Sequence, residues 1–297
     1  MVYHWVYSVH NSVMYHSPLE ECLIIKRRGR PPKNPVVQPV VVYVQNDAEL
    51  LADISERFAV LDVLTAGAAD GTVRSIIVSG SPGIGKSHHV RRILRKKRGC
   101  TYETISGAIS AIQLYKTAYK LRDKNCVIVL DDVDKIWKDL ETLSILKAMC
   151  DSSDIRTISW KKESKALVDE DNGDIPSSFD FEGSVVFITN IDLQRHINEG
   201  KNQYAEQFEA MVSRSMYLNL KIHDKRQVRV WVRHVATNGM FDAEGISKED
   251  GNAILDYVDR NSDQLRDVSF RTVKNLINIK KLYKKGWESV ANMCLNQ

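Results

Sequence analysis

The stretch Ile76-Ile77-Val78-Ser79-Gly80-Ser81-Pro82-Gly83-Ile84-Gly85-Lys86-Ser87 decides the fold of this chain. An apolar segment runs into a loop with the pattern Gly-x-x-x-x-Gly-Lys-Ser, and a basic segment with helical spacing follows at residues 88–97. The glycines allow backbone N–H groups to turn inward around an anion, and the helix directs the positive end of its dipole at the same point. A Gly-rich turn with a chance Lys-Ser is the alternative, but the strand before it and the helix after it favour a phosphate-binding loop.

Each residue type in this loop suits a nucleoside triphosphate. We expect the Lys86 ammonium to reach the β- and γ-phosphates and the Ser87 hydroxyl to ligate Mg²⁺. The other loop residues expected to bind the nucleotide are Gly80, Ser81, Pro82, Gly83, Ile84 and Gly85.

A second apolar run, residues 127–130, ends in two carboxylates, Asp131 and Asp132. Ligands of open α/β sheets bind at the carboxyl ends of the strands. A carboxylate there can hold Mg²⁺, directly or through water, and its neighbour can orient an attacking water. We therefore assign the metal to Asp131 and the water to Asp132, on a strand next to that of the phosphate loop. The alternative is a buried strand followed by an ordinary polar turn.

Length and composition are those of a globular protein. The chain has 297 residues, 43% hydrophobic and 27% charged, with a net charge of +4. This mild charge does not by itself identify a polyanionic partner. Five scattered cysteines indicate reduced thiols of an intracellular protein, and no apolar run has the length of a membrane span. We expect a cytoplasmic protein associated with the nucleoid, or a nuclear one in a eukaryote.

Strands and helices alternate from residue 73 onward, which is typical of a parallel sheet with crossover helices. The expected strands are residues 73–78, 102–105, 126–130, 185–189 and 216–222, and the expected helices are residues 48–64, 109–122, 140–149 and 204–212. Only helical spacing follows, at residues 225–237, 247–260 and 270–283. The predicted domains are an extended arm (1–45), an α/β nucleotide-binding core (46–222) and an all-helical domain (223–297).

Over residues 48–283 the chain resembles the AAA+ ATPases, a branch of P-loop NTPases in which a helical lid follows the α/β core. The resemblance implies that the nucleotide is ATP and that it is hydrolysed. In that family the acidic strand usually ends in Asp-Glu, and the Glu polarises the attacking water. Here the second position is Asp132, one methylene shorter.

The resemblance carries three further positions. Asn190, after the strand at 185–189, is similar to the sensor-1 residue that places the water, although a plain strand-end Asn is the alternative. Arg214 resembles the arginine finger of clamp loaders, and its alternative is an Arg that stabilises a helix end. Arg271 matches the sensor-2 arginine, with a solvated helix Arg as its alternative. A finger acting between subunits implies a homo-oligomer with shared active sites.

The predicted arm carries a basic, proline-rich stretch at residues 26–35 that resembles an AT-hook. Gly29 permits close approach to a narrow minor groove, and Arg28 and Arg30 enter its negative potential. Lys26 and Lys33 are placed to contact phosphates. The resemblance implies A·T-rich DNA as a partner, and a plain basic tail is the alternative.

These features predict an oligomeric ATPase that remodels DNA or protein assemblies on DNA, in the manner of a loader or initiator. Residues 107–111 lack the aromatic-hydrophobic-Gly pore loop of unfoldases. One alternative is an ATP-switched DNA-binding module with little hydrolysis, and another is a protein remodeller that its arm only localises; the client protein is unknown. An alternating segment within 155–182 places Trp160 either on a partner or DNA, or on the core.

Overall fold

The computed structural model describes residues 45–161, 167, 173–200 and 203–296. The basic stretch at 26–35 lies outside the described residues, as does most of the segment 162–172. The description below concerns the compact unit Gln45–Gln297.

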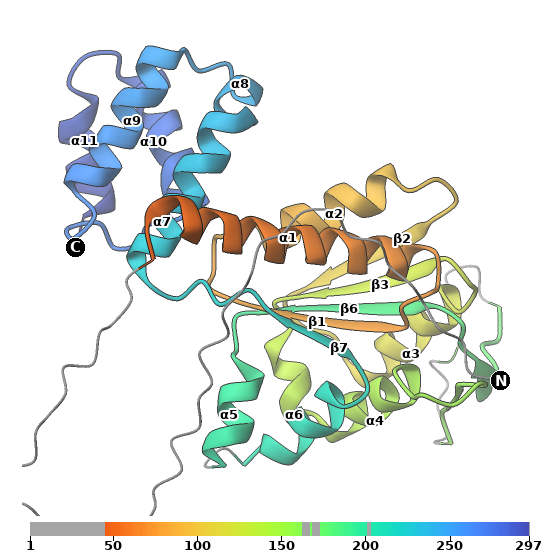
Figure 1. Ribbon diagram of the computed structural model, residues 1–297. Helices are drawn as coiled ribbons and strands as arrows, with labels where there is room; N and C mark the ends of the chain where they lie inside the picture. The colour runs from red at the N-terminus through yellow and green to blue at the C-terminus, as the bar shows by residue number, and fades with distance from the viewer. Residues whose placement is uncertain (1–44, 162–166, 168–172, 201–202, 297) are drawn as a thin grey trace, which may run out of the picture. The chain divides into compact units, whose positions relative to one another are not determined.

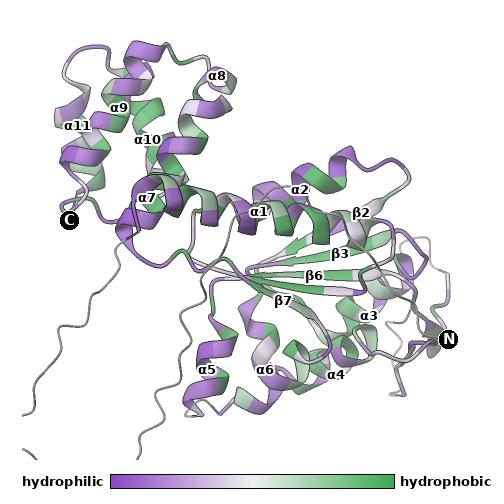
Figure 2. Ribbon diagram, in the orientation of Figure 1, coloured by the Kyte–Doolittle hydropathy of each residue, from purple (hydrophilic) through white to green (hydrophobic). Residues whose placement is uncertain are grey.

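A parallel five-stranded sheet forms the centre of this unit (Figure 1). Its strands lie in the order β2 (Thr101–Ser106), β3 (Cys126–Asp131), β6 (Ser184–Thr189), β1 (Ser75–Ser79) and β7 (Met216–Asn219). The three inner strands are almost entirely buried, which explains their unbroken apolar sequences, because both faces of a parallel sheet are covered. Figure 2 shows these strands as the most hydrophobic elements of the core.

The expectation that the acidic strand lies next to the strand of the phosphate loop is wrong. Strand β6 lies between β1 and β3, with Ser79 opposite Thr189 and Asp131 opposite Ile188. The carboxyl ends of the three strands still meet at one edge of the sheet. The strand between them adds Asn190 to that edge, between the loop and the acidic pair.

Helices cover both faces of the sheet (Figure 1). Helices α1 (Asp47–Ala69) and α2 (Lys86–Lys96) cover one face, and α3 (Ala111–Lys120), α4 (Leu140–Met149), α5 (Leu193–Glu199) and α6 (Ala205–Val212) cover the other. Each face has its own cluster of buried apolar side chains. Helix α1 begins with a capping box between Asn46 and Glu49, which satisfies two backbone N–H groups at its start.

The C-terminal part of the chain is a helical region of residues 225–295. It contains α7 (Lys225–Val235), α8 (Phe241–Ala243), α9 (Lys248–Arg260), α10 (Phe270–Leu282) and α11 (Trp287–Leu295). Helix α7 ends earlier than its sequence predicts, in a π-helical turn at Ala236–Met240. The backbone leaves helical geometry at Asn238 and at Gly239, whose φ of 128° favours glycine.

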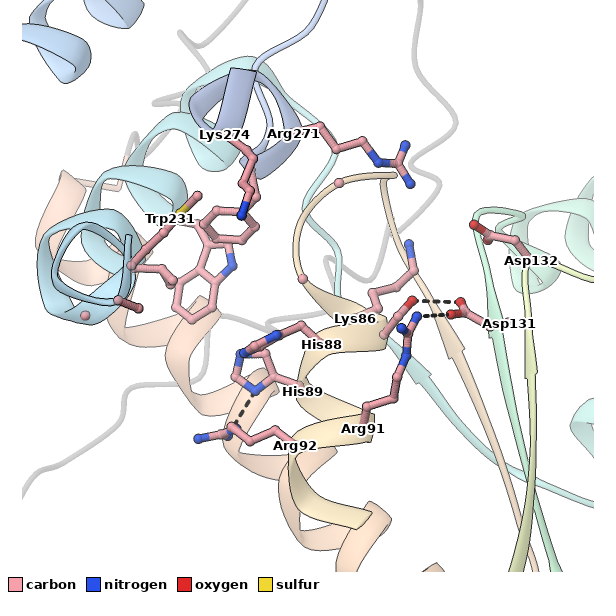
Figure 3. Close-up of a pocket in the computed structure, with 18 of the residues that line it drawn as sticks. Lys86, His88, His89, Arg91, Arg92, Asp131, Asp132, Trp231, Arg271 and Lys274 are labelled. Carbon is pink, nitrogen blue, oxygen red and sulfur yellow. Dashed lines mark hydrogen bonds and ion pairs between the residues drawn. The ribbon is translucent and has the colours of Figure 1, made fainter. Parts of the chain in front are cut away.

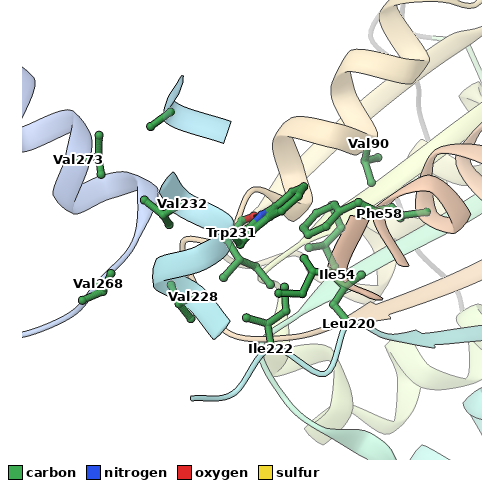
Figure 4. Close-up of a cluster of buried hydrophobic side chains, with 14 of the residues drawn as sticks. Ile54, Phe58, Val90, Leu220, Ile222, Val228, Trp231, Val232, Val268 and Val273 are labelled. Atoms are coloured by element: carbon green, nitrogen blue, oxygen red, sulfur yellow. The ribbon is translucent and has the colours of Figure 1, made fainter. Parts of the chain in front are cut away.

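The helical region packs directly on the core through Trp231 of α7 (Figure 4). The Trp231 ring stacks on Phe58 of α1 with 4.4 Å between centroids, and its indole Nε1 donates a 3.0 Å hydrogen bond to the carbonyl oxygen of Ile84. The apolar cluster on this face of the sheet therefore continues into the helical region. A side chain of the helical region thus holds the backbone of the phosphate loop.

A two-stranded antiparallel sheet, β4 (Thr157–Ser159) with β5 (Ser178–Asp180), forms within the alternating segment at 155–182. The Trp160 ring lies 5.8 Å from that of Tyr115 and packs against the second apolar cluster. This placement favours the core position of Trp160 over a contact with a partner.

Together these elements confirm the predicted fold class: an α/β core built on a parallel sheet, with the Gly-rich loop directly after β1, followed by a helical C-terminal region. In the part of the chain that the structure describes, no helix has both the length and the apolar character needed to cross a membrane.

Candidate nucleotide-binding site

The phosphate loop joins β1 to α2, and two of its glycines have left-handed backbones. Gly83 has φ of 71° and Gly85 has φ of 98°. A Cβ on Gly83 would lie 2.7 Å from the Cβ of Ser269. The helical region therefore approaches the loop so closely that only glycine fits at position 83. The N–H of Phe270 donates a 2.9 Å hydrogen bond to the Gly83 carbonyl oxygen. The loop thus has the shape of an anion cradle at the start of a helix.

Lys86, the first residue of α2, is 6% exposed and lies at the centre of the site. Its ammonium donates to the carbonyl oxygens of Gly80 and Ser81, at 2.7 and 2.8 Å, and to Oδ1 of Asn190 at 2.8 Å. Burial lowers the pKa of Lys86 from 10.5 to about 8, against the opposing charges of Asp132 and Asp131. The ammonium is therefore held beside the loop, and it loses its proton at a lower pH than an ordinary lysine does.

This pKa predicts a pH dependence of nucleotide binding. Only the charged amine attracts phosphate, and it loses its proton as the pH rises through about 8. We expect the affinity for ATP to fall by roughly tenfold between pH 7 and pH 9, measured by titration with a fluorescent ATP analogue. The Lys86→Arg variant keeps its charge over this range and should show a flat profile. A flat profile in the unaltered chain, or the same decline in the Lys86→Arg variant, would contradict the prediction.

The hydroxyl oxygen of Ser87 and the carboxylate of Asp131 lie side by side and are suited to a divalent cation. Asp131 is 5% exposed. The Ser87 hydroxyl donates to Asp131 Oδ1 at 2.7 Å, while Arg91 Nη2 lies 2.7 Å from Oδ2 (Figure 3). A hydroxyl and a carboxylate are hard oxygen ligands of the kind that Mg²⁺ prefers. This donor set fits the magnesium ion that the sequence assigns to Ser87 and Asp131.

Asp132 and Asn190 lie at the mouth of the site. The Asn190 amide Nδ2 donates to Asp132 Oδ1 at 2.9 Å, and the Asp132 N–H donates to the Ile188 carbonyl oxygen. Asp132 has φ of 56°, a left-handed conformation in which Asp and Asn are the most common residues after glycine. Partial burial and the neighbouring charge of Asp131 raise the pKa of Asp132. Its carboxyl is thus oriented by Asn190 and made more basic than an ordinary Asp.

These side chains line a cleft of about 1080 Å³ between the core and the helical region. Drug-sized ligands occupy pockets of roughly 300–1000 Å³, so the cleft has room for a nucleotide. Arg271, the second residue of α10, extends over the phosphate loop toward Lys86 (Figure 3). The predicted site residues that line the cleft are Gly83, Gly85, Lys86, Ser87, Asp131, Asp132, Asn190 and Arg271.

Four loop residues that the sequence assigns to the nucleotide do not line the cleft. Ile84 is buried and Pro82 is exposed. Gly80 and Ser81 supply carbonyl oxygens to Lys86, and the Ser81 hydroxyl donates to the Ile222 carbonyl oxygen just before the helical region.

Arg214 lies apart from this cleft, at the opposite edge of the sheet. It precedes β7, whose Met216 pairs with Ile76 near the amino end of β1. Its Nη1 donates to the Ala210 carbonyl oxygen at 2.7 Å, and its Nε lies 3.8 Å from Asp151. Arg214 is about one-third exposed and does not line the cleft.

Three residues of the site were missed in the sequence analysis: Arg91, Trp231 and Phe270. Arg91 lies one helical turn after Ser87, at the i+4 spacing that places both on one face of α2. That spacing is a signal that the sequence contains. The contacts of Trp231 and Phe270 with the loop join segments nearly 150 and 190 residues apart, and no local pattern indicates them.

One protein of similar sequence was found in enterobacteria phage T4. It is an uncharacterized 36.7 kDa protein of the nrdC-mobD intergenic region, 36% identical over 242 residues, spanning 80% of this chain and 73% of the phage protein. No protein-family model matches the chain.

Solved structures resemble this chain more distantly. A mutant form of RuvB from Thermotoga maritima is 13% identical, with a TM-score of 0.45 over 86% of this chain and 77% of its own. AMPPCP-bound DnaA of Aquifex aeolicus is 14% identical, with a TM-score of 0.44 over 84% of this chain and 65% of its own.

Proposed function

We propose that this chain, which belongs to the same protein family as the 36.7 kDa phage T4 protein, binds Mg-ATP in its cleft and hydrolyses it. The observation that carries the proposal is the meeting of Lys86, Asp131 and Asp132 at one edge of the sheet, around a loop shaped for phosphate. We further propose that hydrolysis drives the remodelling of DNA or of protein assemblies on DNA, as in loaders and initiators.

The residues divide the work of holding the triphosphate. The N–H groups of the loop and of the first turn of α2 bind phosphate oxygens, and Lys86 exchanges its carbonyl partners for the β- and γ-phosphates. Arg271 adds a positive charge from the helical region. When Mg²⁺ is bound by Ser87 and Asp131, it neutralises charge on the phosphates.

Hydrolysis requires a water in line with the γ-phosphate. Asp132 accepts a hydrogen bond from that water and takes its proton as the bond from the water oxygen to the γ-phosphorus forms. The bond from that phosphorus to the bridging oxygen breaks, and ADP leaves with the electron pair, while Asn190 fixes the carboxylate of Asp132. The raised pKa of Asp132 brings it closer to the range useful for a general base. Because Trp231 and Phe270 bond to loop carbonyls, a change in the loop with the nucleotide state would move the helical region.

Arg214 serves, in this proposal, the cleft of a neighbouring subunit in a homo-oligomer. The Arg214→Ala variant should then bind ATP within twofold of the unaltered chain while its turnover falls by about 100-fold or more. The Arg195→Ala variant, which removes an exposed arginine of α5, should keep its turnover.

A mixing experiment tests the shared site. Subunits with Lys86→Ala still supply Arg214, and subunits with Arg214→Ala still supply an intact loop. Mixtures of the two variants should therefore recover turnover that neither has alone, and the rate per subunit of the unaltered chain should rise with protein concentration. Full turnover by Arg214→Ala alone, or mixtures that recover no turnover, would refute the finger.

The A·T-rich DNA partner stays part of the proposal through the basic stretch at 26–35. An ATP-switched module with little hydrolysis is the second candidate, favoured by the short side chain of Asp132. Turnover measured with and without A·T-rich duplex separates the two, since a switch binds ATP tightly and turns over in neither condition. If deletion of residues 26–35 left DNA affinity and A·T preference unchanged, the arm would not be the DNA contact.

A further inference from the structure

The outer face of α2 carries a continuous row of basic side chains. His88, Arg91, Arg92, Arg95 and Lys96 recur at the i, i+3, i+4, i+7, i+8 spacing of one helix face. We call this row the basic stripe. The opposite face of α2 is buried against the core through Val90 and Leu94. Over residues 86–98 the sequence has seven Lys and Arg and no Asp or Glu.

The charges of the stripe are neutralised at one end only. Arg91 pairs with Asp131 at 2.7 Å, and Arg92 pairs with Asp62. Farther along, Arg95 Nε lies 3.3 Å from the Tyr102 hydroxyl. Within the described residues no carboxylate lies in ion-pair distance of Arg95 or Lys96. Both side chains are exposed, so the net positive charge of the stripe is concentrated at its far end.

The stripe also borders the nucleotide cleft. A hollow of about 460 Å³ is lined by the five residues of the stripe alone. Three of them, His88, Arg91 and Arg92 (Figure 3), also line the cleft, so the two hollows share these side chains. Arg91 connects the two hollows, because its guanidinium donates a hydrogen bond to the carboxylate of Asp131, the residue assigned to magnesium.

These features fit a row of phosphates better than a protein surface. Arginine is common in both kinds of interface, but the stripe contains no apolar or aromatic hydrocarbon side chain, whereas protein interfaces are enriched in Tyr, Trp, Phe and Met and depleted in Lys. Eight residues of helix rise span about 12 Å. A DNA strand carries roughly three to four phosphates over that length, at about 3.4 Å each along the axis. Arginine forks and a lysine ammonium are suited to such oxygens.

We propose that the basic stripe binds the phosphate backbone of DNA, at a site separate from the arm and beside the nucleotide cleft. The inference deepens the proposed function, since it rests on DNA as the partner of this ATPase. It places bound DNA where Arg91 can sense it. Because the contacts are to phosphates, binding through the stripe is independent of base sequence.

The test uses the full chain and a fluorescein-labelled 30-base-pair duplex, with anisotropy measured from 50 to 200 mM salt. The Arg95→Glu/Lys96→Glu variant should bind at least tenfold more weakly at 100 mM salt. Its slope of log affinity against log salt should fall by about 2, near 0.9 for each lost phosphate contact. The Lys284→Glu/Lys285→Glu variant is the matched control, because it makes the same charge change at two exposed, adjacent positions of the helical region. It should stay within twofold.

The same comparison in the Arg28→Ala/Arg30→Ala background removes the arm from the result, and the stripe variant should again lower the remaining affinity. Equal affinity and equal salt slope of the stripe variant and its control would overturn the proposal, as would an unaltered chain that binds no duplex at 50 mM salt. Melting temperatures confirm that each variant is folded. ATP binding is measured in parallel: a chain that binds DNA through the stripe but no ATP refutes the proposed ATPase and leaves the stripe standing.

Discussion

The Lys86→Ala variant is expected to lose at least 100-fold in affinity for ATP, and with it all measurable turnover. Its ammonium is the buried positive charge of the phosphate loop, held by three oxygen acceptors within 2.8 Å. A 100-fold loss corresponds to about 2.8 kcal/mol, a reasonable loss for a charge-assisted contact to phosphate in a partly desolvated site. The measurement is equilibrium titration with a fluorescent ATP analogue and Mg²⁺.

The control for this variant is Lys284→Ala, which removes an exposed lysine far from the cleft. Because burial of Lys86 disfavours its charge, its loss should leave the melting temperature close to that of the unaltered chain. Weak binding would then reflect the missing charge and not a missing fold. An affinity for ATP within threefold of the unaltered chain would show that the loop does not hold the phosphates.

The Asp132→Asn variant is expected to bind ATP normally and to turn it over at least 100-fold more slowly, within the range that a general base contributes. Asparagine keeps the size, and it also accepts the left-handed backbone found at this position. It cannot take a proton from water. Removing the negative charge beside Asp131 should, if anything, tighten the binding of the triphosphate.

Rates under saturating ATP and binding titrations together separate these effects. Asp154→Asn, an exposed carboxylate in a turn, serves as the matched control and should keep full turnover. Full turnover by Asp132→Asn would remove this residue from the mechanism. Absence of turnover in the unaltered chain, with tight ATP binding, would favour the ATP-switched module instead.

The buried strands and the phosphate loop could be predicted because their physics is local. A run of Val and Ile between turn residues is a parallel strand that both layers cover, and the glycines of the loop are needed at left-handed positions such as Gly85. The acidic pair in which β3 ends, Asp131 and the following Asp132, can be predicted in the same way. Asp131 and Asp132 were found by their place after a strand, without knowledge of its neighbours.

What could not be predicted depends on contacts between distant segments. No spacing in the sequence shows that β6 enters between β1 and β3, because strand order is decided by how the crossover helices pack. The bonds from Trp231 and Phe270 to loop carbonyls likewise arise only when the helical region docks. The early end of α7 comes just before the kink at Asn238 and Gly239, where the backbone leaves helical geometry.

The backbone at Asp132 gives a physical reason why this chain has Asp-Asp where the AAA+ ATPases usually have Asp-Glu. The second residue occupies a left-handed conformation, with its N–H bonded to Ile188 and its carboxylate bonded to Asn190. Aspartate adopts this backbone more readily than glutamate does. The amide of Asn190 orients the short side chain of Asp132, so this carboxylate fits its proposed role of positioning the attacking water.

Calorimetric titration of the full chain with a non-hydrolysable ATP analogue, with and without Mg²⁺, is the most direct measurement of the central proposal. We expect one site per chain, and an affinity that falls when the metal is removed, because Ser87 and Asp131 then hold no ion against the phosphates. Absence of any binding heat in the presence of Mg²⁺, in a protein shown to be folded, would contradict the account.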